Sequence, residues 1–230
     1  MPGTSERCSS LFDKTAGEFA RGTDSLIQQQ RYRRGDLIVA AAERHAVPGG
    51  FILDYGCGPG RIACLLGDRG FRVRAVDPSP EMILEAAAIR RSTDNVEFAT
   101  LGDPGQELSP RTYDAIICSS VIEYVAEPAK LLQGFNSALR DSGILIISFA
   151  NRLSLWRAYA ELRFRRSAPH FALQTSIQRW GEFQRLLVGT GFRTLDGPIF
   201  FESVFDKYKK FSWLSGSAWI GTLGLVVAKK

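Results

Sequence analysis

The stretch Phe51-Ile52-Leu53-Asp54-Tyr55-Gly56-Cys57-Gly58-Pro59-Gly60-Arg61-Ile62-Ala63 decides the fold of this 230-residue chain. It begins with a short apolar run that is typical of a buried strand. Three glycines at alternate positions follow, and then an apolar pattern with helical spacing. A strand, a glycine turn and a helix in this order place backbone N–H groups and a positive helix end at one edge of a sheet. The stretch therefore predicts an α/β domain that binds a ligand at this turn.

Two ligands are compatible with this turn. The run from Gly58 to Ala63 matches G-x-G-x-x-A, a dinucleotide-binding fingerprint. Asp54 with Gly56-x-Gly58-x-Gly60 instead resembles the first motif of class I S-adenosylmethionine-dependent methyltransferases. The resemblance implies that the aspartate and the glycine turn hold the amino and carboxylate ends of the methionine moiety. A tight strand-to-helix turn in some other α/β domain is a third interpretation.

A second acid ends the second predicted strand, which runs from Arg72 to Asp77. Asp77 follows the glycine turn at about the spacing of a carboxylate that receives ribose hydroxyls, in dinucleotide enzymes and methyltransferases alike. The run from Asp77 to Met82 resembles the methyltransferase pattern D-x-S-x-x-M. In that pattern Ser79 is the expected N-cap of the next helix, and the resemblance implies that Met82 packs beside the adenine. A plain core methionine is the alternative for Met82.

The fourth predicted strand and its exit favour the methyltransferase interpretation. The segment from Tyr113 to Val125, with Pro128 after it, resembles the fourth motif of small-molecule methyltransferases, which dinucleotide dehydrogenases do not usually carry. The turn and fifth strand from Asp141 to Ser148 also resemble that family, without its turn proline. The resemblance is strong over roughly residues 30–150 and weak in the remainder of the chain.

The resemblance implies a Rossmann-like, doubly wound α/β fold: a seven-stranded sheet with an antiparallel last strand, a helical N-terminal cover and a lid insertion after strand five. We expect a single domain over residues 1–230. Within it, 1–48 is the helical cover, 49–150 the cofactor-binding core, 151–176 the lid and 177–230 the C-terminal part of the sheet. The pattern predicts helices over 24–45, 151–166 and 176–188, and a final strand over 223–230.

The resemblance also implies site residues. The expected S-adenosyl-L-methionine-binding residues are Asp54, Gly56, Cys57, Gly58, Gly60, Asp77, Pro78, Met82, Gly102, Asp103, Ser119 and Arg33. Asp103 follows strand three and would bind the adenine amino group, unless it is a simple turn aspartate. Some relatives place a histidine beside the glutamate after strand four, where this chain has Tyr124. If a general base exists, the candidates are Glu123, Tyr124 and His170.

Composition limits the function further. Apolar residues make up 45% of the chain, the formal net charge is +5, and the four cysteines have no C-x-x-C spacing. The two histidines form no metal-ligand pattern, so we expect no metal. Because no segment reaches the roughly 20 apolar residues that span a bilayer, we expect a soluble cytoplasmic protein.

The acceptor is expected to be a small, apolar or ring-bearing or lipid-like molecule, methylated on oxygen, nitrogen or carbon. Nucleic acid is not expected as a partner. The basic, aromatic segment 151–166 suggests contact with an anionic acceptor or a membrane surface. Two other functions stay open at this point: an NAD(P)-dependent oxidoreductase, and a non-catalytic methyltransferase-like binding subunit.

Overall fold

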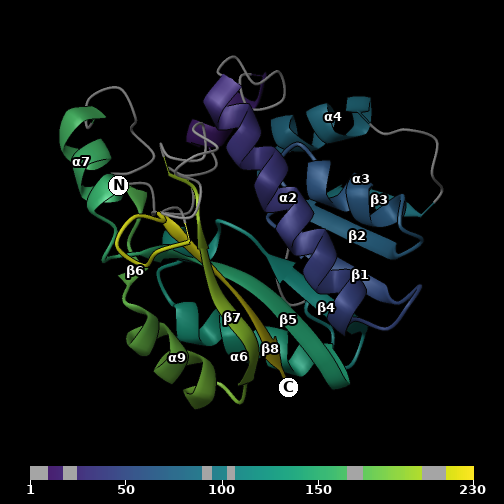
Figure 1. Cartoon of the computed structure of the whole chain (residues 1–230). Helices are drawn as coiled ribbons and strands as arrows, with labels where there is room; N and C mark the ends of the chain where they lie inside the picture. The colour runs from purple at the N-terminus through teal and green to yellow at the C-terminus, as the bar shows by residue number, and fades with distance from the viewer. Residues whose placement is uncertain (1–9, 18–24, 90–94, 103–106, 165–172, 204–215) are drawn as a thin grey trace.

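The computed structural model describes residues 10–17, 25–89, 95–102, 107–164, 173–203 and 216–230, with side chains in the first long helix described from Arg33 onward. Seven strands form one continuous sheet in the order β3-β2-β1-β4-β5-β8-β7 (Figure 1). They are β1 (Phe51–Tyr55), β2 (Arg72–Asp77), β3 (Val96–Thr100), β4 (Tyr113–Cys118), β5 (Leu139–Asn151), β7 (Arg193–Phe201) and β8 (Leu223–Lys229). The first five are parallel, while β8 runs antiparallel between β5 and β7. This confirms the predicted Rossmann-like sheet with an antiparallel last strand.

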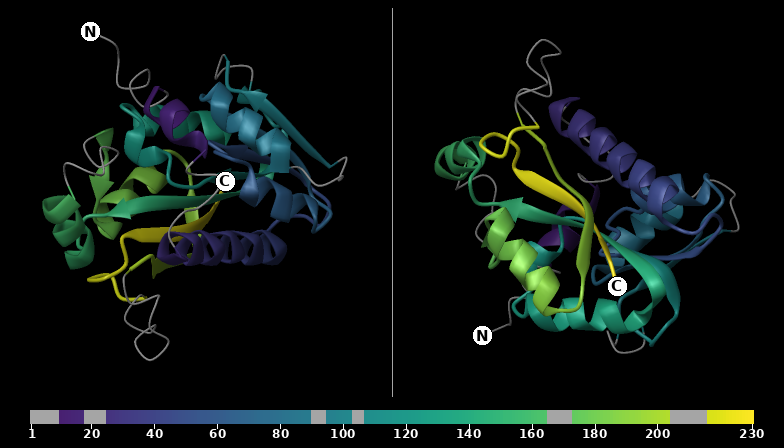
Figure 2. Two further views of the ribbon diagram at one scale, coloured as in Figure 1. Left: turned by 90° about the horizontal axis from the view of Figure 1, so that it is seen from above. Right: turned by 60° about the horizontal axis from the view of Figure 1, so that its bottom comes forward.

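Helices cover both faces of the sheet. They are α2 (Ser25–His45), α3 (Arg61–Gly67), α4 (Pro80–Ile89), α6 (Pro128–Ala138) and α9 (Trp180–Gly189). Two further elements are the helix α7 (Leu155–Phe164), which lies off the end of the sheet (Figure 1), and the 3-10 turn η1 (Ile122–Tyr124). Figures 1 and 2 show α2 along one face and α6 and α9 along the other. Because side chains alternate along a strand, Ile52 packs under α2 and α3 while its neighbour Leu53 packs under α6 and α9. Among the described residues, none of the helices combines the length and hydrophobicity needed to cross a bilayer.

The sequence predicted a helix over 176–188, but the helix in the structure begins later. Residues Ile177–Gln178 instead form a short strand, β6, which pairs with the end of β5 at Ala150 and Asn151. The helix starts only at Trp180, where the Glu182 carboxylate accepts the backbone N–H of the N-cap residue Arg179 at 2.9 Å. An eighth strand therefore joins the sheet beside its seven-stranded path.

The lid helix also begins later than predicted, at Leu155 instead of residue 151. Asn151 is the last residue of β5, and its side-chain amide donates to the backbone carbonyls of Ala218 and Gly221 at 2.6 and 2.8 Å. The helix is capped by Ser154, whose hydroxyl accepts the Arg157 N–H at 3.1 Å. Because the Asn151 side chain is hydrogen-bonded to this distant loop, residue 151 stays in the strand and the helix begins later.

Candidate functional site

The glycine turn after β1 has the conformation that the sequence predicts. Gly56, Gly58 and Gly60 lie in the left-handed region, with φ of 76°, 53° and 76°. The N–H groups of Gly56 and Cys57 both donate to the Val76 carbonyl, which ties the turn to β2. A Cβ on Gly60 would lie 2.6 Å from the Phe98 ring, whereas a Cβ on Gly58 would meet no atom within 4 Å. The turn is therefore packed tightly at Gly60 and open at Gly58.

Asp77, at the end of β2, organises the other side of this turn. Its carboxylate accepts the Gly58 N–H at 2.8 Å and the Ser79 N–H at 3.0 Å. The Ser79 hydroxyl in turn accepts the Met82 N–H at 3.2 Å, which confirms Ser79 as the N-cap of α4. Burial raises the pKa of Asp77, and the two N–H donors oppose that rise, while the charge of Asp13 adds to it. One carboxylate thus fixes both the open glycine and the start of the next helix.

Asp54 is the penultimate residue of β1, just before the glycine turn, and is only 1% exposed. Its Oδ2 has no hydrogen-bond partner within the described part of the chain. Burial raises the pKa of Asp54 to about 7, the nearby Asp77 charge adds to the rise, and a hydrogen bond from the Ala63 N–H opposes it. An orphaned buried carboxylate oxygen is costly in a folded protein. A cationic ligand group beside the Asp54 carboxylate would offset this cost.

Substituting Asp54 by Asn should stabilise the ligand-free protein far more at pH 8 than at pH 5. The carboxyl ionises near 3.8 in the unfolded chain and near 7 in the folded one, so folding stability falls as pH rises through that window. Asparagine carries no such penalty. We expect its gain at pH 8 to exceed that at pH 5 by about 2 kcal/mol, or roughly 4–8 °C in Tm. Thermal unfolding at both pH values measures this, with Glu81→Gln as an exposed control. An equal gain at both pH values would contradict the buried-carboxyl account.

The exit from β4 brings further polar atoms to the same edge of the sheet. Ser120 has a φ of 56°, and its N–H donates to the Ser148 hydroxyl at 2.8 Å. The hydroxyls of Ser119 and Ser120 and the Oε2 of Glu123 are buried without a hydrogen-bond partner in the described ranges. Together with Asp54 they form a group of orphaned polar atoms at the carboxyl ends of β1 and β4, where ligands bind in open α/β sheets.

The helix over residues 10–17 covers this edge. The Ser79 hydroxyl donates to the Asp13 carboxylate, which places the helix above the start of α4. The Phe12 ring meets the Tyr124 ring edge-on, with 5.5 Å between their centroids. The predicted N-terminal cover therefore spans from the Asp77 side of the edge to η1.

Two of the predicted catalytic candidates, Glu123 and Tyr124, lie together in η1. Glu123 is 1% exposed. Burial raises the pKa of its carboxyl to about 7. That rise is opposed by its own backbone N–H and by the charges of Arg34 and Arg157, whereas the charge of Glu202 adds to it. The Tyr124 hydroxyl accepts a hydrogen bond from the Gln174 side chain at 3.2 Å.

The remaining predicted residues are placed as follows. Met82 is buried, and Pro78 precedes the Ser79 cap. Burial raises the pKa of the Cys57 thiol. Arg33 lies on α2, partly buried, and Gly102 follows β3 on the surface. Asp103 and His170 lie outside the described residues.

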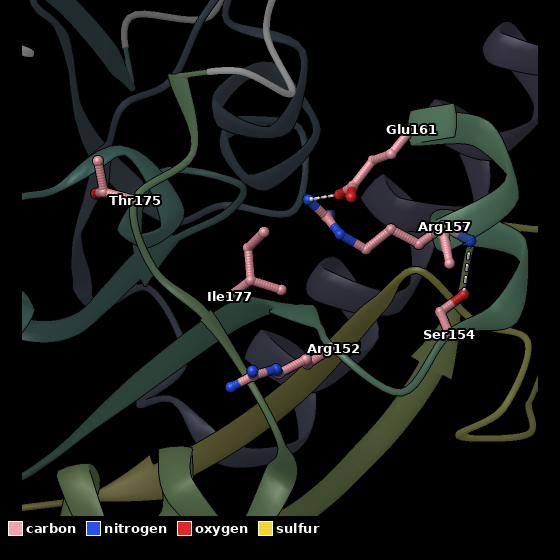
Figure 3. Close-up of a pocket in the computed structure, with 7 residues that line it drawn as sticks. Arg152, Ser154, Arg157, Glu161, Thr175 and Ile177 are labelled. Atoms are coloured by element: carbon pink, nitrogen blue, oxygen red, sulfur yellow. Dashed lines mark hydrogen bonds and ion pairs between the residues drawn. The ribbon is translucent and has the colours of Figure 1, made fainter. Parts of the chain in front are cut away.

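Sequence reasoning missed the residues that surround η1 from the lid, above all Arg157 and Gln174. Arg157 lines a pocket of about 340 Å³ between α7 and the segment 173–178 (Figure 3). Its walls are Arg152, Ser154, Arg157, Ala158, Glu161, Thr175 and Ile177. No motif marks Gln174, and in the sequence Arg157 is one of several arginines in the predicted lid, so the sequence held no signal for either.

Comparison with known proteins identifies the family. A family model described as a methyltransferase domain matches residues 26–196. Ubiquinone biosynthesis O-methyltransferase of Xanthomonas campestris pv. campestris (strain B100) is 30% identical over 114 residues, which cover 48% of this chain and 47% of that protein. The enzyme of the same name from Rickettsia akari (strain Hartford) is 37% identical over 110 residues, covering 47% of this chain and 43% of that one. The chain thus spans about half the length of the curated relatives it matches.

Solved structures share the fold over most or all of the chain. Magnesium protoporphyrin IX methyltransferase from Synechocystis PCC 6803, crystallised with bound SAM, superposes with a TM-score of 0.70. It is 19% identical, and the match covers 100% of this chain and 98% of that one. At this identity the likeness shows the fold alone.

Proposed function

The chain belongs to the class I S-adenosylmethionine-dependent methyltransferase family, and from that premise we propose that it transfers a methyl group to a small acceptor. The observation that carries the proposal is the geometry of Asp54, Gly58 and Asp77. An orphaned carboxylate, an open left-handed glycine and a second carboxylate lie around one turn at the carboxyl edge of the sheet. A dinucleotide site would share the turn and Asp77, but the family match favours the methyltransferase.

These residues fit S-adenosylmethionine. Asp54 would take the cationic amino group, since its Oδ2 has no partner within the described residues and its burial disfavours an unpaired charge. The open face of Gly58 would admit the methionine carboxylate, with Gly56, Cys57 and Gly60 shaping the turn. Asp77 would receive the ribose hydroxyls on the lone pairs that the two N–H donors leave unused. Met82, Pro78, Gly102, Asp103, Ser119 and Arg33 remain proposed contacts.

The bound cofactor supplies an electrophilic methyl group on a sulfonium sulfur. The chain has to align an acceptor with that methyl and exclude water, and such positioning can lower a barrier by ~7–11 kcal/mol in favourable cases. Glu123 suits the role of proton acceptor, because a carboxyl whose pKa is about 7 is partly ionised at neutral pH. Tyr124, held by Gln174, would orient the acceptor. His170 stays a candidate base.

An apolar, ring-bearing acceptor methylated on a hydroxyl is the substrate class we favour. The relatives with significant identity act, by name, in ubiquinone biosynthesis as O-methyltransferases. A phenolic hydroxyl must lose its proton as it accepts the methyl group, and the buried Glu123 carboxylate could accept that proton as a general base. We place the reaction in the cytoplasm as part of the same proposal.

Transfer of a labelled methyl group from S-adenosylmethionine to a panel of alkylated catechols, simple phenols and amines tests this function. We expect catechol products, with kcat about 100-fold lower in Glu123→Gln and a smaller loss in Tyr124→Phe. The control is Glu81→Gln, an exposed acid on α4. Labelling of amines alone, or equal rates in Glu123→Gln and the control, would contradict the assignment.

A membrane surface is the proposed source of a lipid-like acceptor. Leu155, Tyr159 and Leu162 are exposed along one face of α7, Leu162 to 84%. Trp219 is also exposed, and its backbone lies next to Leu155, because its carbonyl accepts the Leu155 N–H at 2.8 Å. We call these four residues the α7 stripe. An exposed apolar helix face with Arg163 in its last turn fits an anionic lipid interface.

Co-sedimentation with vesicles of phosphatidylglycerol and phosphatidylcholine tests the α7 stripe. We expect wild type to bind the anionic vesicles, with Leu162→Glu reducing binding at least about 10-fold. Val188→Glu, on the exposed side of α9, is the matched control and should bind like wild type. No binding by wild type, or equal losses in the two variants, would overturn the membrane contact.

A further inference from the structure

Arg157 occupies an unusual place in the lid. It lies on α7, yet it is only 4% exposed. Its guanidinium pairs with Glu161 at 2.7 Å, one helical turn on (Figure 3). It also donates to the side-chain oxygen of Gln174. Burying an arginine is costly unless its donors are satisfied. These contacts hold the side chain on the pocket side of α7, opposite the α7 stripe.

The partners of Arg157 lead directly to η1. Gln174 accepts from Arg157 with its oxygen and donates to the Tyr124 hydroxyl with its nitrogen. The next two backbone N–H groups, those of Thr175 and Ser176, donate to the Glu123 carbonyl at 2.7 and 3.1 Å. The segment 174–176 thus holds the turn that carries both candidate catalytic residues, and Arg157 fixes the side chain at one end of that segment.

Charges from several elements face the Glu123 carboxyl. Arg34 comes from α2, Arg157 from α7, Glu202 from the residues after β7, and the Cys118 thiol from β4. Arg34 is neutralised by Glu202, since its Nε lies 2.7 Å from a Glu202 carboxylate oxygen. Arg157 is paired with Glu161 at 2.7 Å in the same way, and its charge opposes the rise in the pKa of Glu123.

We infer that Arg157 is a positioning residue for the acceptor side of the site: it fixes Tyr124 through Gln174 and supplies positive charge beside Glu123. Arg157 reaches no acceptor atom in this role and acts through its neighbours. The lid helix α7 then contributes to the site, because any displacement of α7 moves both the Arg157 charge and its hydrogen bond to Gln174. The inference rests on the proposed function for its consequence, while its test needs neither cofactor nor acceptor.

Carbon-13 NMR titration of glutamate side chains measures the effect. The Glu123 signal is identified by its loss in Glu123→Gln. We expect a midpoint near pH 7 in wild type, and a midpoint higher by several tenths to about 1 unit in Arg157→Gln, because a nearby positive charge is removed. Arg152→Gln, on the same pocket but exposed, should keep the wild-type midpoint. An unchanged midpoint in Arg157→Gln would overturn the inference.

Arg157→Lys provides a second test should Arg157→Gln fail to fold. Lysine keeps the charge, but its shorter side chain does not place an N–H where Nη2 of Arg157 contacts both Glu161 and Gln174. We expect a Glu123 midpoint close to wild type and a Tyr124 ring signal that changes as it does in Gln174→Leu. A Tyr124 signal identical to wild type in Arg157→Lys would contradict the positioning role. Because no methyl transfer is measured, these results stand apart from those of the acceptor panel.

Discussion

Replacing Asp77 by Ala should lower the affinity for S-adenosylhomocysteine by at least about 100-fold. The carboxylate accepts hydrogen bonds from the backbone N–H groups of Gly58 and Ser79. Its loss therefore frees both the glycine turn at Gly58 and the start of α4. It also removes the proposed acceptor of the ribose hydroxyls. Hydrogen bonds to a charged group are worth about 1.5–3 kcal/mol each, so two of them account for such a loss.

Asp196→Ala is the matched control for this substitution. Asp196 lies on β7, where it pairs with Arg44 and His45, away from the glycine turn. We expect it to bind the homocysteine compound like wild type in calorimetric titration. Thermal unfolding of both variants excludes global unfolding as the cause. Wild-type affinity in Asp77→Ala would show that the ligand lies elsewhere on the sheet.

The second large effect separates Gly60 from Gly58. Gly60→Ala should destabilise the protein by about 3 kcal/mol, because alanine is strained at a φ of 76° and its Cβ would lie 2.6 Å from the Phe98 ring. For a chain of this size that is a fall in Tm of roughly 6–12 °C. Gly58→Ala, which meets no atom within 4 Å, should lose only about 1 kcal/mol.

Gly58→Ala, the variant with the smaller loss of stability, should have the larger loss of ligand affinity. The methyl group of Gly58→Ala would occupy the open side of the turn, where the ligand is proposed to approach. We expect its affinity for S-adenosylhomocysteine to fall by at least about 10-fold while the protein remains folded. Differential scanning calorimetry and titration of both variants measure the two effects. A stable Gly60→Ala, or a Gly58→Ala that binds like wild type, would contradict the described turn.

Much of the cofactor side could be predicted because its contacts are local. The strand, turn and helix around Gly56 to Gly60 follow from glycine spacing and apolar pattern. The Ser79 cap lies three residues from the N–H that it accepts. Asp77 and Gly58 are farther apart, but Asp77 ends β2 and Gly58 follows β1. The sequence predicts both strands, and adjacent parallel strands bring their carboxyl ends together.

On the proposed acceptor side, Glu123 and Tyr124 could be named from the sequence. Their partners could not, because those contacts join distant segments. Tyr124 meets Gln174 and Phe12, which come from the lid segment and the N-terminal cover. Neither pairing leaves a pattern in the residues themselves. The predicted starts of α7 and α9 were wrong for the same reason. Asn151 is hydrogen-bonded to the loop at 218–221, and β6 forms because the end of β5 lies beside it.

Calorimetric titration of wild-type protein with S-adenosylhomocysteine, and separately with NADH and NADPH, tests the central claim most directly. We predict saturable binding of the homocysteine compound and no heat from either dinucleotide, because Asp54 would pair with an amino group that the dinucleotides lack at this position. Binding of NADH or NADPH in place of S-adenosylhomocysteine would contradict the account, and so would the absence of binding by all three.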